Sequence, residues 1–396
     1  MTALLLFFTF VLFDAEFVKT LLDLNEAAWQ SLGDETVPPE QDLATLTDLT
    51  EKLAQWVPKS FLQEHVTEAL PPNRGETIRL KGHVVFVKKY AVKAFAAKNQ
   101  NAVYCCTMIL SGGTTVEIFC SAIPQTWKQD LPIQECAAAW GVYVKSYVTT
   151  PVFAAPAIEW YPDTWLGNLG FNVASLDQIP VCRVTKKDQN DDETNRLAFK
   201  FTEADQEPFY GLLRAVSATA EGWLEKEAKK QYAETPYAVT DLFNRPGETR
   251  GKPILLRGTA KRIIQSSVTN SEVHAMFGID HYYQIYLFTN QSQGNPIVVC
   301  VHSLPEGMPV GDAADFSVPM TVAAIPYKLW IYETSQGLHY APILVGRSPV
   351  GLPVPARHPL PETFTTISFA AFFTLALIWY GCRLWVRQKQ KPESRL

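Results

Sequence analysis

The stretch Arg79-Leu80-Lys81-Gly82 returns later in the chain as Leu255-Leu256-Arg257-Gly258. Around the first copy, apolar residues or glycine recur at every second position: Ile78, Leu80, Gly82, Val84 and Phe86. This period of two predicts a β-strand. A glycine inside such a strand is typical of the sharp bend with which a small β-barrel closes. The repeated stretch therefore predicts two small barrels.

Four further correspondences follow, and they indicate that a whole domain is duplicated. The pairs are Gly75-Glu76-Thr77 with Gly247-Glu248-Thr249, residues 120–124 with 300–305, Val144-Lys145-Ser146-Tyr147 with Tyr327-Lys328-Leu329-Trp330, and Ala155-Pro156 with Ala341-Pro342. The separation between partners grows from 172 to 186 residues. Such growth is expected when small loop insertions follow a duplication.

Helices are predicted ahead of each barrel. Within residues 14–72 an apolar stripe has three- and four-residue spacing: Leu43, Leu46, Leu49, Leu53 and Trp56. Residues 207–232 repeat this spacing, which is that of an amphipathic helix. Because Glu207-Pro208-Phe209 echoes Glu16-Phe17, we expect the helix to belong to the duplicated unit.

The predicted fold class is α+β, mainly β, with two duplicated OB-like small β-barrel domains, each preceded by helical segments, and one C-terminal transmembrane helix. A β-sandwich half in place of each barrel is left open. The predicted parts are 1–13 (signal or apolar helix), 14–72 (helical), 75–180 (first barrel), 181–250 (charged loop and amphipathic helix), 251–348 (second barrel), 349–362 (Pro-rich stalk), 363–385 (transmembrane helix) and 386–396 (basic tail).

Two hairpins are predicted inside the barrels. Gly112-Gly113 suits a two-residue turn, and a polar loop at 289–295 joins strands at 282–288 and 296–301. The two-residue turn would place Cys105 opposite Cys120 in the wider type of antiparallel pair. We therefore favour buried free thiols over a disulfide at these positions.

Residues 363–382 contain no charged side chain, and about 20 apolar residues suffice to span a bilayer. The segment predicts a membrane-spanning helix, with the lipid bilayer as a partner. Its marker residues are Thr363, Phe369, Phe373, Leu377, Trp379 and Cys382. The bases that follow it and set the topology are Arg383, Arg387, Lys389 and Lys391.

Because bases stay on the cytoplasmic side, we expect a single-pass cell-membrane protein with a cytoplasmic C-terminus and extracytoplasmic domains. Residues 3–13 have the length of the apolar part of an export signal, but no Lys or Arg precedes them. A tail-anchored protein with cytoplasmic domains is the alternative.

Composition narrows the function classes. The net charge of −5 argues against nucleic acid as a partner, and 19% charged residues argue against wholesale disorder. Basic residues do mix with aromatic ones in the first half, at Lys88, Lys89, Tyr90, Lys93 and Phe95, and Lys261 and Arg262 recur in the second. Proteins that bind single-stranded nucleic acid combine basic and aromatic residues in this way.

Catalytic motifs are missing from the sequence. No G-x-S-x-G, G-x-G-x-x-G, Walker-type, H-E-x-x-H or C-x-x-C pattern occurs, so neither a catalytic residue nor a cofactor is predicted. His274, Asp280, His281 and His302 are the candidates for a metal site, although the first half has no matching set. Arg74 with Glu76, and Arg245 with Glu248, are predicted to pair locally.

The stretches at residues 254–262 and Gly278-Ile279-Asp280-His281-Tyr282-Tyr283 resemble uncharacterised bacterial single-pass membrane proteins with tandem small OB-like barrels. The resemblance covers most of the chain and implies no known activity. We therefore expect a membrane-anchored, non-enzymatic binding or scaffold protein of the bacterial cell envelope, with other envelope proteins as partners. The alternatives are an enzyme or metal-binding protein with a site near His281 and His302, and a tail-anchored adaptor that faces the cytoplasm.

Overall fold

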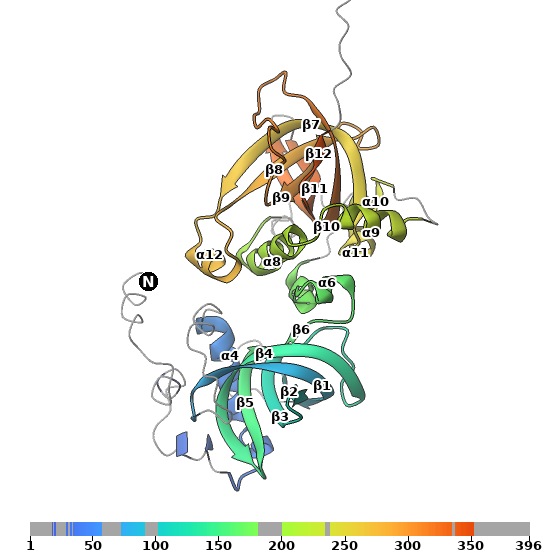
Figure 1. Cartoon of the computed structure of the whole chain (residues 1–396). Helices are drawn as coiled ribbons and strands as arrows, with labels where there is room; N and C mark the ends of the chain where they lie inside the picture. The colour runs from blue at the N-terminus through green and yellow to red at the C-terminus, as the bar shows by residue number, and fades with distance from the viewer. Residues whose placement is uncertain are drawn as a thin grey trace, which may run out of the picture. The chain divides into compact units, whose positions relative to one another are not determined.

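The computed structural model describes residues 18, 20, 29–30, 32–33, 35–57, 73–91, 102–180, 200–233, 238–334 and 337–351. The chain divides into two compact units, residues 1–352 and 353–396. All described residues belong to the first unit, and they form two β domains in tandem (Figure 1).

The first β domain is a closed barrel. Its strands are β1 (Thr77–Ala91), β2 (Ala102–Leu110), β3 (Thr115–Ala122), β4 (Pro132–Tyr147), β5 (Thr150–Ala157) and β6 (Glu159–Trp160). They form one sheet in the order β1-β2-β3-β5-β4-β6, and β1 also pairs with β4, which closes the barrel. Strands β3 and β5 are parallel, whereas the neighbouring pairs are antiparallel.

The second β domain repeats this topology. Its strands are β7 (Ile254–Ser267), β8 (His281–Phe288), β9 (Ile297–Val301), β10 (Val318–Thr334), β11 (Gly337–Gly346) and β12 (Val350–Gly351). Its strand order is β11-β9-β8-β7-β10-β12, and β10 also pairs with β11, which closes the barrel. When β7 to β12 are taken as the counterparts of β1 to β6, the same strands are neighbours in both barrels, and β9 and β11 form the parallel pair. The shared closed order confirms the tandem repeat, fits the OB-like expectation and excludes a β-sandwich half.

The transmembrane part of the predicted fold class is wrong for the structure as described. In the ranges above, no helix has both the length and the apolar character that crossing a membrane requires. The predicted segment at 363–385, its marker residues from Thr363 to Cys382 and the bases Arg383, Arg387, Lys389 and Lys391 all lie outside the described residues.

Helices and short turns flank the barrels. They are η2 (Pro39–Gln41), α4 (Leu43–Trp56), α6 (Trp165–Asn168), η3 (Val173–Gln178), η4 (Glu203–Asp205), α8 (Gln206–Ser217), α9 (Trp223–Gln231), α10 (Asp241–Asn244), α11 (Pro246–Thr249) and α12 (Ser271–Phe277). The single helix expected over 207–232 is therefore two, α8 and α9. The break ends at Gly222, whose φ of 72° is outside the helical range.

Each barrel has an inner core and a second core under a helix. Inside the first barrel, side chains such as Leu80, Met108 and Ile118 are buried together. On its outer surface, α4 covers Phe119 and Val152 with the expected stripe, of which Leu46, Leu49 and Leu53 are fully buried. In the second barrel α8 covers Cys300 and Val345 in the same way. Because these strands are buried on both faces, they contain more apolar residues than a strictly alternating pattern would.

The repeated glycine has a steric reason. A Cβ atom on Gly82 would lie 2.1 Å from the carbonyl oxygen of Ile109, and one on Gly258 would lie 2.4 Å from that of Phe288. Both glycines therefore let the first strand of the barrel approach the second. Just beyond each glycine the strand has a bulge, between Val84 and Phe86 in β1 and between Ala260 and Arg262 in β7.

A second bulge recurs in the fourth strand of each barrel and aims a lysine at a helix. Because of the bulge between Tyr143 and Lys145, both Val144 and Lys145 face α4 rather than alternating. The counterpart in β10 lies between Pro326 and Lys328. Lys145 Nζ lies 2.7 Å from Asp42 Oδ2, which precedes α4.

The same buried ion pair exists in the second domain. Lys328 Nζ lies 2.8 Å from Asp205 Oδ1 and donates to the carbonyl oxygen of Lys200 at 2.9 Å. Tyr327 Oη donates to Asp205 Oδ1 at 3.2 Å. Asp205 precedes α8 as Asp42 precedes α4, where the helix dipole favours a negative charge. Each pair thus joins the start of a helix to its barrel.

The ion pairs correct the predicted helix alignment. The counterpart of α8 is α4, with Leu46 and Leu49 matching Phe209 and Leu212, and not the segment after Glu16. The match of Gly75 with Gly247 is also wrong. Gly75 N–H donates to Tyr143 O and Gly251 N–H donates to Pro326 O, so Gly251 is the counterpart.

Two strand matches shift as well. Cys120 pairs across the sheet with Ala155, and its structural counterpart Val301 pairs with Gly346. The predicted matches of Cys120 with Cys300 and of Ala155 with Ala341 are therefore wrong. The longer β10–β11 hairpin accounts for the second error.

The predicted β2–β3 hairpin is confirmed, but its turn is not. The N–H of Leu110 bonds to Thr114 O, so three residues form the loop, with Gly113 at φ 84°. The extra residue shifts the register by one, and Cys105 lies opposite Phe119 while Tyr104 lies opposite Cys120. Cys105, Cys106, Cys120, Cys136 and Cys300 are all free thiols.

Candidate functional site

The four metal-site candidates do not converge. His281 Nδ1 lies 2.6 Å from Asp280 Oδ1, and the His281 and His302 rings stack at 6.3 Å. The hydrogen bond from His281 lowers the pKa of the exposed Asp280 carboxyl. His274 lies on α12, a separate element. Within the ranges that the structure describes, no three His, Cys, Asp or Glu side chains are grouped to hold a metal, so the geometry lends that alternative no support.

The predicted local arginine pairs are present in part. Arg245 bonds to Asp241 at 2.7 Å and to Glu248 at 3.4 Å, at an exposed position. Arg74 instead lies over the Trp29 ring, 3.8 Å from its centroid. Its counterpart Arg250 donates to the carbonyl oxygens of Ile179 and Tyr327. These arginines hold segments of the chain together.

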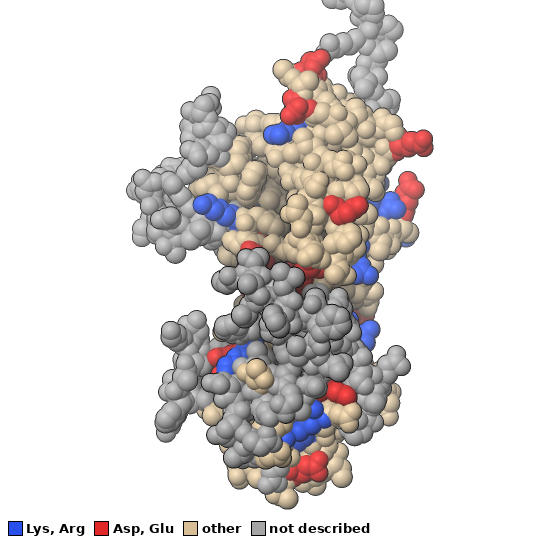
Figure 2. Space-filling view, turned by 90° about the vertical axis from the view of Figure 1, so that its left-hand side faces the viewer, with Lys and Arg blue, Asp and Glu red and all other residues tan. Residues whose placement is uncertain are grey.

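Lys88 and Lys89, two of the basic residues of the first half, lie over aromatic rings of their own barrel. Lys88 lies 4.5 Å from the Tyr90 ring centroid and Lys89 lies 5.9 Å from that of Tyr104. Tyr90 Oη donates to Glu40 at 2.9 Å, and burial with this bond raises the pKa of Tyr90. Lys93 and Phe95 lie outside the described residues. Among the described residues on the face that Figure 2 presents, the Lys and Arg side chains are spread out, with Asp and Glu side chains between them.

The second barrel has a cluster of partly exposed rings, which we call the aromatic surface: Tyr286, Trp330, Tyr332 and His339. Trp330 and Tyr332 stack with their centroids 5.5 Å apart, and Tyr332 stacks on His339 at 5.6 Å. Arg262 lies over the Tyr286 ring at 5.2 Å. Burial raises the pKa of Tyr286 and Tyr332, so both hydroxyls stay neutral.

Strand geometry explains why these rings meet. Trp330 and Tyr332 are two residues apart on β10 and so share a face. Tyr332 is directly opposite His339 on β11, as a cross-strand pair. The rings lie beside the core under α8 and remain only half-buried. A surface of stacked rings held by a sheet needs little ordering before it binds a partner.

The first barrel does not have this surface. There the hairpin turns at Val148 and Thr149, directly after Tyr147, whereas β10 runs on to Thr334 before β11 begins at Gly337. Sequence reasoning matched Trp330 with Tyr147 but missed the surface. The signal for it was the alternation of Trp330 and Tyr332 in a hairpin longer than its partner.

No family model matches the chain, and no curated protein matches it significantly. The resemblance to tandem-barrel membrane proteins therefore stays a prediction. The candidate site depends on the geometry of the aromatic surface.

Proposed function

We propose that the chain is a non-enzymatic binding or scaffold protein, and that its second OB-like barrel binds a protein partner through the aromatic surface. The supporting observation is the row of stacked, half-exposed rings from Trp330 to His339 with Arg262 beside it. Tyr, Trp and Arg dominate the energetics of protein interfaces, since they bury much area at low cost in side-chain entropy.

Protein is favoured over nucleic acid as the partner. A single strand would need a basic groove beside the rings. Arg262 is 3.9 Å from Asp312, which offsets its charge, and the chain has a net charge of −5. The envelope location and envelope partners expected from the sequence stay predictions, and the aromatic surface is compatible with either face of a membrane.

Site-specific photo-crosslinking in the native host tests the proposal. We expect p-benzoylphenylalanine in place of Tyr332 to yield a discrete protein adduct, because Tyr332 is central to the aromatic surface. The matched control places the same group at Val148, the exposed turn of the shorter hairpin. Trp330→Ala should weaken binding of the identified partner by about 2 kcal/mol, as expected for an interface hot spot.

Three results would contradict the proposal. They are no adduct at Tyr332, the same adducts at Val148, or an adduct that nuclease removes. The last would identify nucleic acid as the partner.

A further inference from the structure

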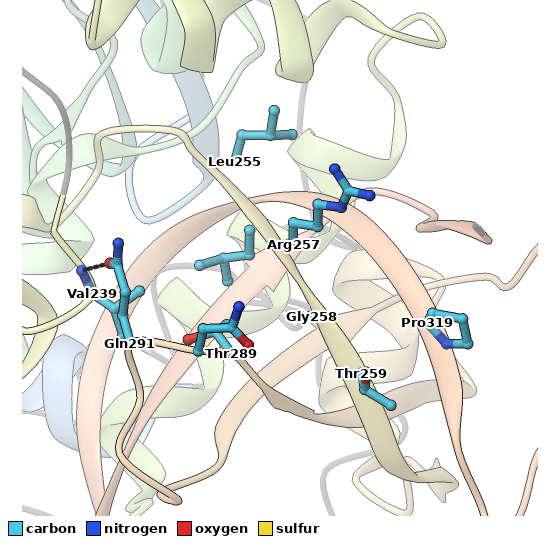
Figure 3. A pocket seen from close by; sticks show the side chains of 10 residues that line it. Val239, Leu255, Arg257, Gly258, Thr259, Thr289, Gln291 and Pro319 are labelled. Atoms are coloured by element: carbon cyan, nitrogen blue, oxygen red, sulfur yellow. Dashed lines mark hydrogen bonds between the residues drawn. The ribbon is translucent and has the colours of Figure 1, made fainter. Parts of the chain in front are cut away.

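A pocket of about 490 Å³ opens beside strand β7 of the second barrel (Figure 3). One wall is the strand itself from Leu255 to Thr259. The other is the loop after β8, at Thr289, Asn290 and Gln291. The volume is within the usual range of small-molecule sites, about 300–1,000 Å³. The pocket is separate from the aromatic surface.

The charged side chain in the lining of this pocket is an arginine. Arg257 is exposed, and within the described part of the chain its guanidinium has neither an ion pair nor a hydrogen bond. The lining includes no Asp or Glu. An arginine presents five N–H donors in a planar fork that matches a carboxylate or a phosphate.

The loop adds directed donors. Gln291 Oε1 accepts the N–H of Val239 at 3.2 Å, as the dashed line in Figure 3 shows. This bond fixes the amide, so its NH₂ end is available to donate. Thr289 also borders the pocket, but its Oγ1 is enclosed and out of reach of water, so the hydroxyl is not among the donors that a ligand meets.

The rest of the lining is apolar. Val239, Leu255 and Pro319 border the donors, and Figure 3 shows Leu255 and Arg257 extending from the same side of the strand. A ligand that fits must therefore combine a negative oxygen-rich group with a compact apolar body.

The two barrels differ at this point. In the first barrel the turn between β2 and β3 is short, at residues 111–114, while residues 289–296 connect β8 and β9. Lys81 is the counterpart of Arg257, yet the loop wall is an addition of the second barrel. The longer loop is the part of the repeat that builds the pocket.

We propose that this pocket binds a small organic anion, with a carboxylate or phosphate group held by Arg257 and Gln291 and an apolar body against Val239, Leu255 and Pro319. The proposal is independent of the aromatic surface and of any partner protein bound there.

Ligand-detected NMR titration of the full chain at constant ionic strength tests this. The probes are benzoate for the carboxylate and phenyl phosphate for the phosphate, with benzyl alcohol as the neutral analogue. We expect saturable binding of at least one anion and none of the alcohol. Arg257→Gln should weaken that binding about tenfold or more, as charged hydrogen bonds are lost.

Two further variants make the result specific. Gln291→Glu keeps an acceptor for the Val239 N–H but places a carboxylate in the pocket, and should abolish anion binding. Lys261→Gln removes the same charge from the same strand outside the pocket and should leave the affinity unchanged. Circular dichroism of each variant confirms folding.

Each alternative result overturns the proposal. Either no probe binds to the wild-type chain, or the alcohol binds as well as the anions, or Lys261→Gln weakens binding as much as Arg257→Gln. The last result would mean that only the overall charge attracts anions.

If benzoate binds and phenyl phosphate does not, the ligand class is a carboxylic acid, and the reverse identifies a phosphate ester.

Discussion

Replacing Lys328 by methionine should destabilise the second barrel severely, because it leaves a charge in the interior. Lys328 and Asp205 are only 2% and 1% exposed, so water cannot take over the role of the ammonium group. Methionine keeps most of the apolar stem and removes the charge. Breaking a buried ion pair in this way costs about 3–5 kcal/mol, equivalent to a Tm lower by roughly 6–20 °C for a domain of this size.

The first barrel supplies an internal comparison. The Lys145–Asp42 pair has the same geometry, but the Asp42 side chain is 12% exposed and can be hydrated once its partner is gone. Lys145→Met should therefore cost less, about 1–3 kcal/mol. Adding Asp205→Asn to Lys328→Met should recover part of the loss, since the amide oxygen can still accept from Thr202 N–H and Thr202 Oγ1 while the amide NH₂ donates to Tyr327 Oη.

Amide hydrogen exchange in a urea series is the appropriate assay, because peptides from β10 and from β4 report on the two barrels separately. A loss below about 1 kcal/mol for Lys328→Met would refute the reasoning. So would equal losses for the two lysine variants, or a double variant that is no more stable than the single one.

Three other predictions concern packing, thiols and pH. Gly258→Ala should lower the free energy of urea unfolding by about 1–3 kcal/mol or more, because the new Cβ meets a carbonyl oxygen at 2.4 Å. Gly112→Ala places its Cβ where no atom lies within 4 Å and should change this free energy by no more than about 0.5 kcal/mol. Equal losses would contradict the steric argument. Iodoacetamide should label the exposed Cys136 in the native protein but reach Cys300 only after denaturation, because burial raises the pKa of Cys300 to about 12. Peptide mass spectrometry distinguishes the two sites, and similar labelling rates of both cysteines in the native protein would contradict the prediction. Burial raises the pKa of Tyr282 to about 12, while an unfolded tyrosine titrates near pH ~10. The contribution of Tyr282 to stability is therefore complete below about pH 10 and is lost as the pH rises through 12. Tyr282→Phe should flatten this alkaline fall in stability, and an unchanged slope would count against the prediction.

The sequence predicted the two barrels because barrel closure demands residues that stand out. Gly82 and Gly258 are needed where a Cβ would strike a carbonyl oxygen, and the periodic positions beside them must fill a small interior. Both constraints act within a few residues, so a local pattern reveals them. The stripe of α4 was visible for the same reason.

Features that depend on contacts between distant residues were missed. Asp42 and Lys145 are far apart in sequence, and an ordinary aspartate before a helix gives no sign that a lysine will be buried against it. The alignment of Cys120 with Cys300 failed by one residue because identical letters outweighed strand register, and register is set by turns such as residues 111–113. Helix α12 had a readable signal in its ends, Asn270 as the capping side chain and Gly278 at φ 66°.

The aromatic surface was also beyond the sequence pattern. Trp330 and Tyr332 alternate as any half-buried strand does, and this pattern does not show that Tyr332 stacks on His339 of the neighbouring strand. The pocket at Arg257 likewise needs the loop at 289–296 to fold back beside β7. Alternation shows that a side chain faces outward but not what lies beside it.

The closed strand order has a consequence for synthesis on the ribosome. Strand β1 needs β4, and β3 needs β5, so a barrel cannot close until its fifth strand has emerged. The first five strands of the first barrel end before residue 158, whereas β11 of the second ends at Gly346. At about 5–20 residues per second, the first barrel has roughly ten seconds or more to close before its twin is complete. Tandem copies with one strand order could exchange equivalent strands, and this delay in time protects the pair from such misassembly.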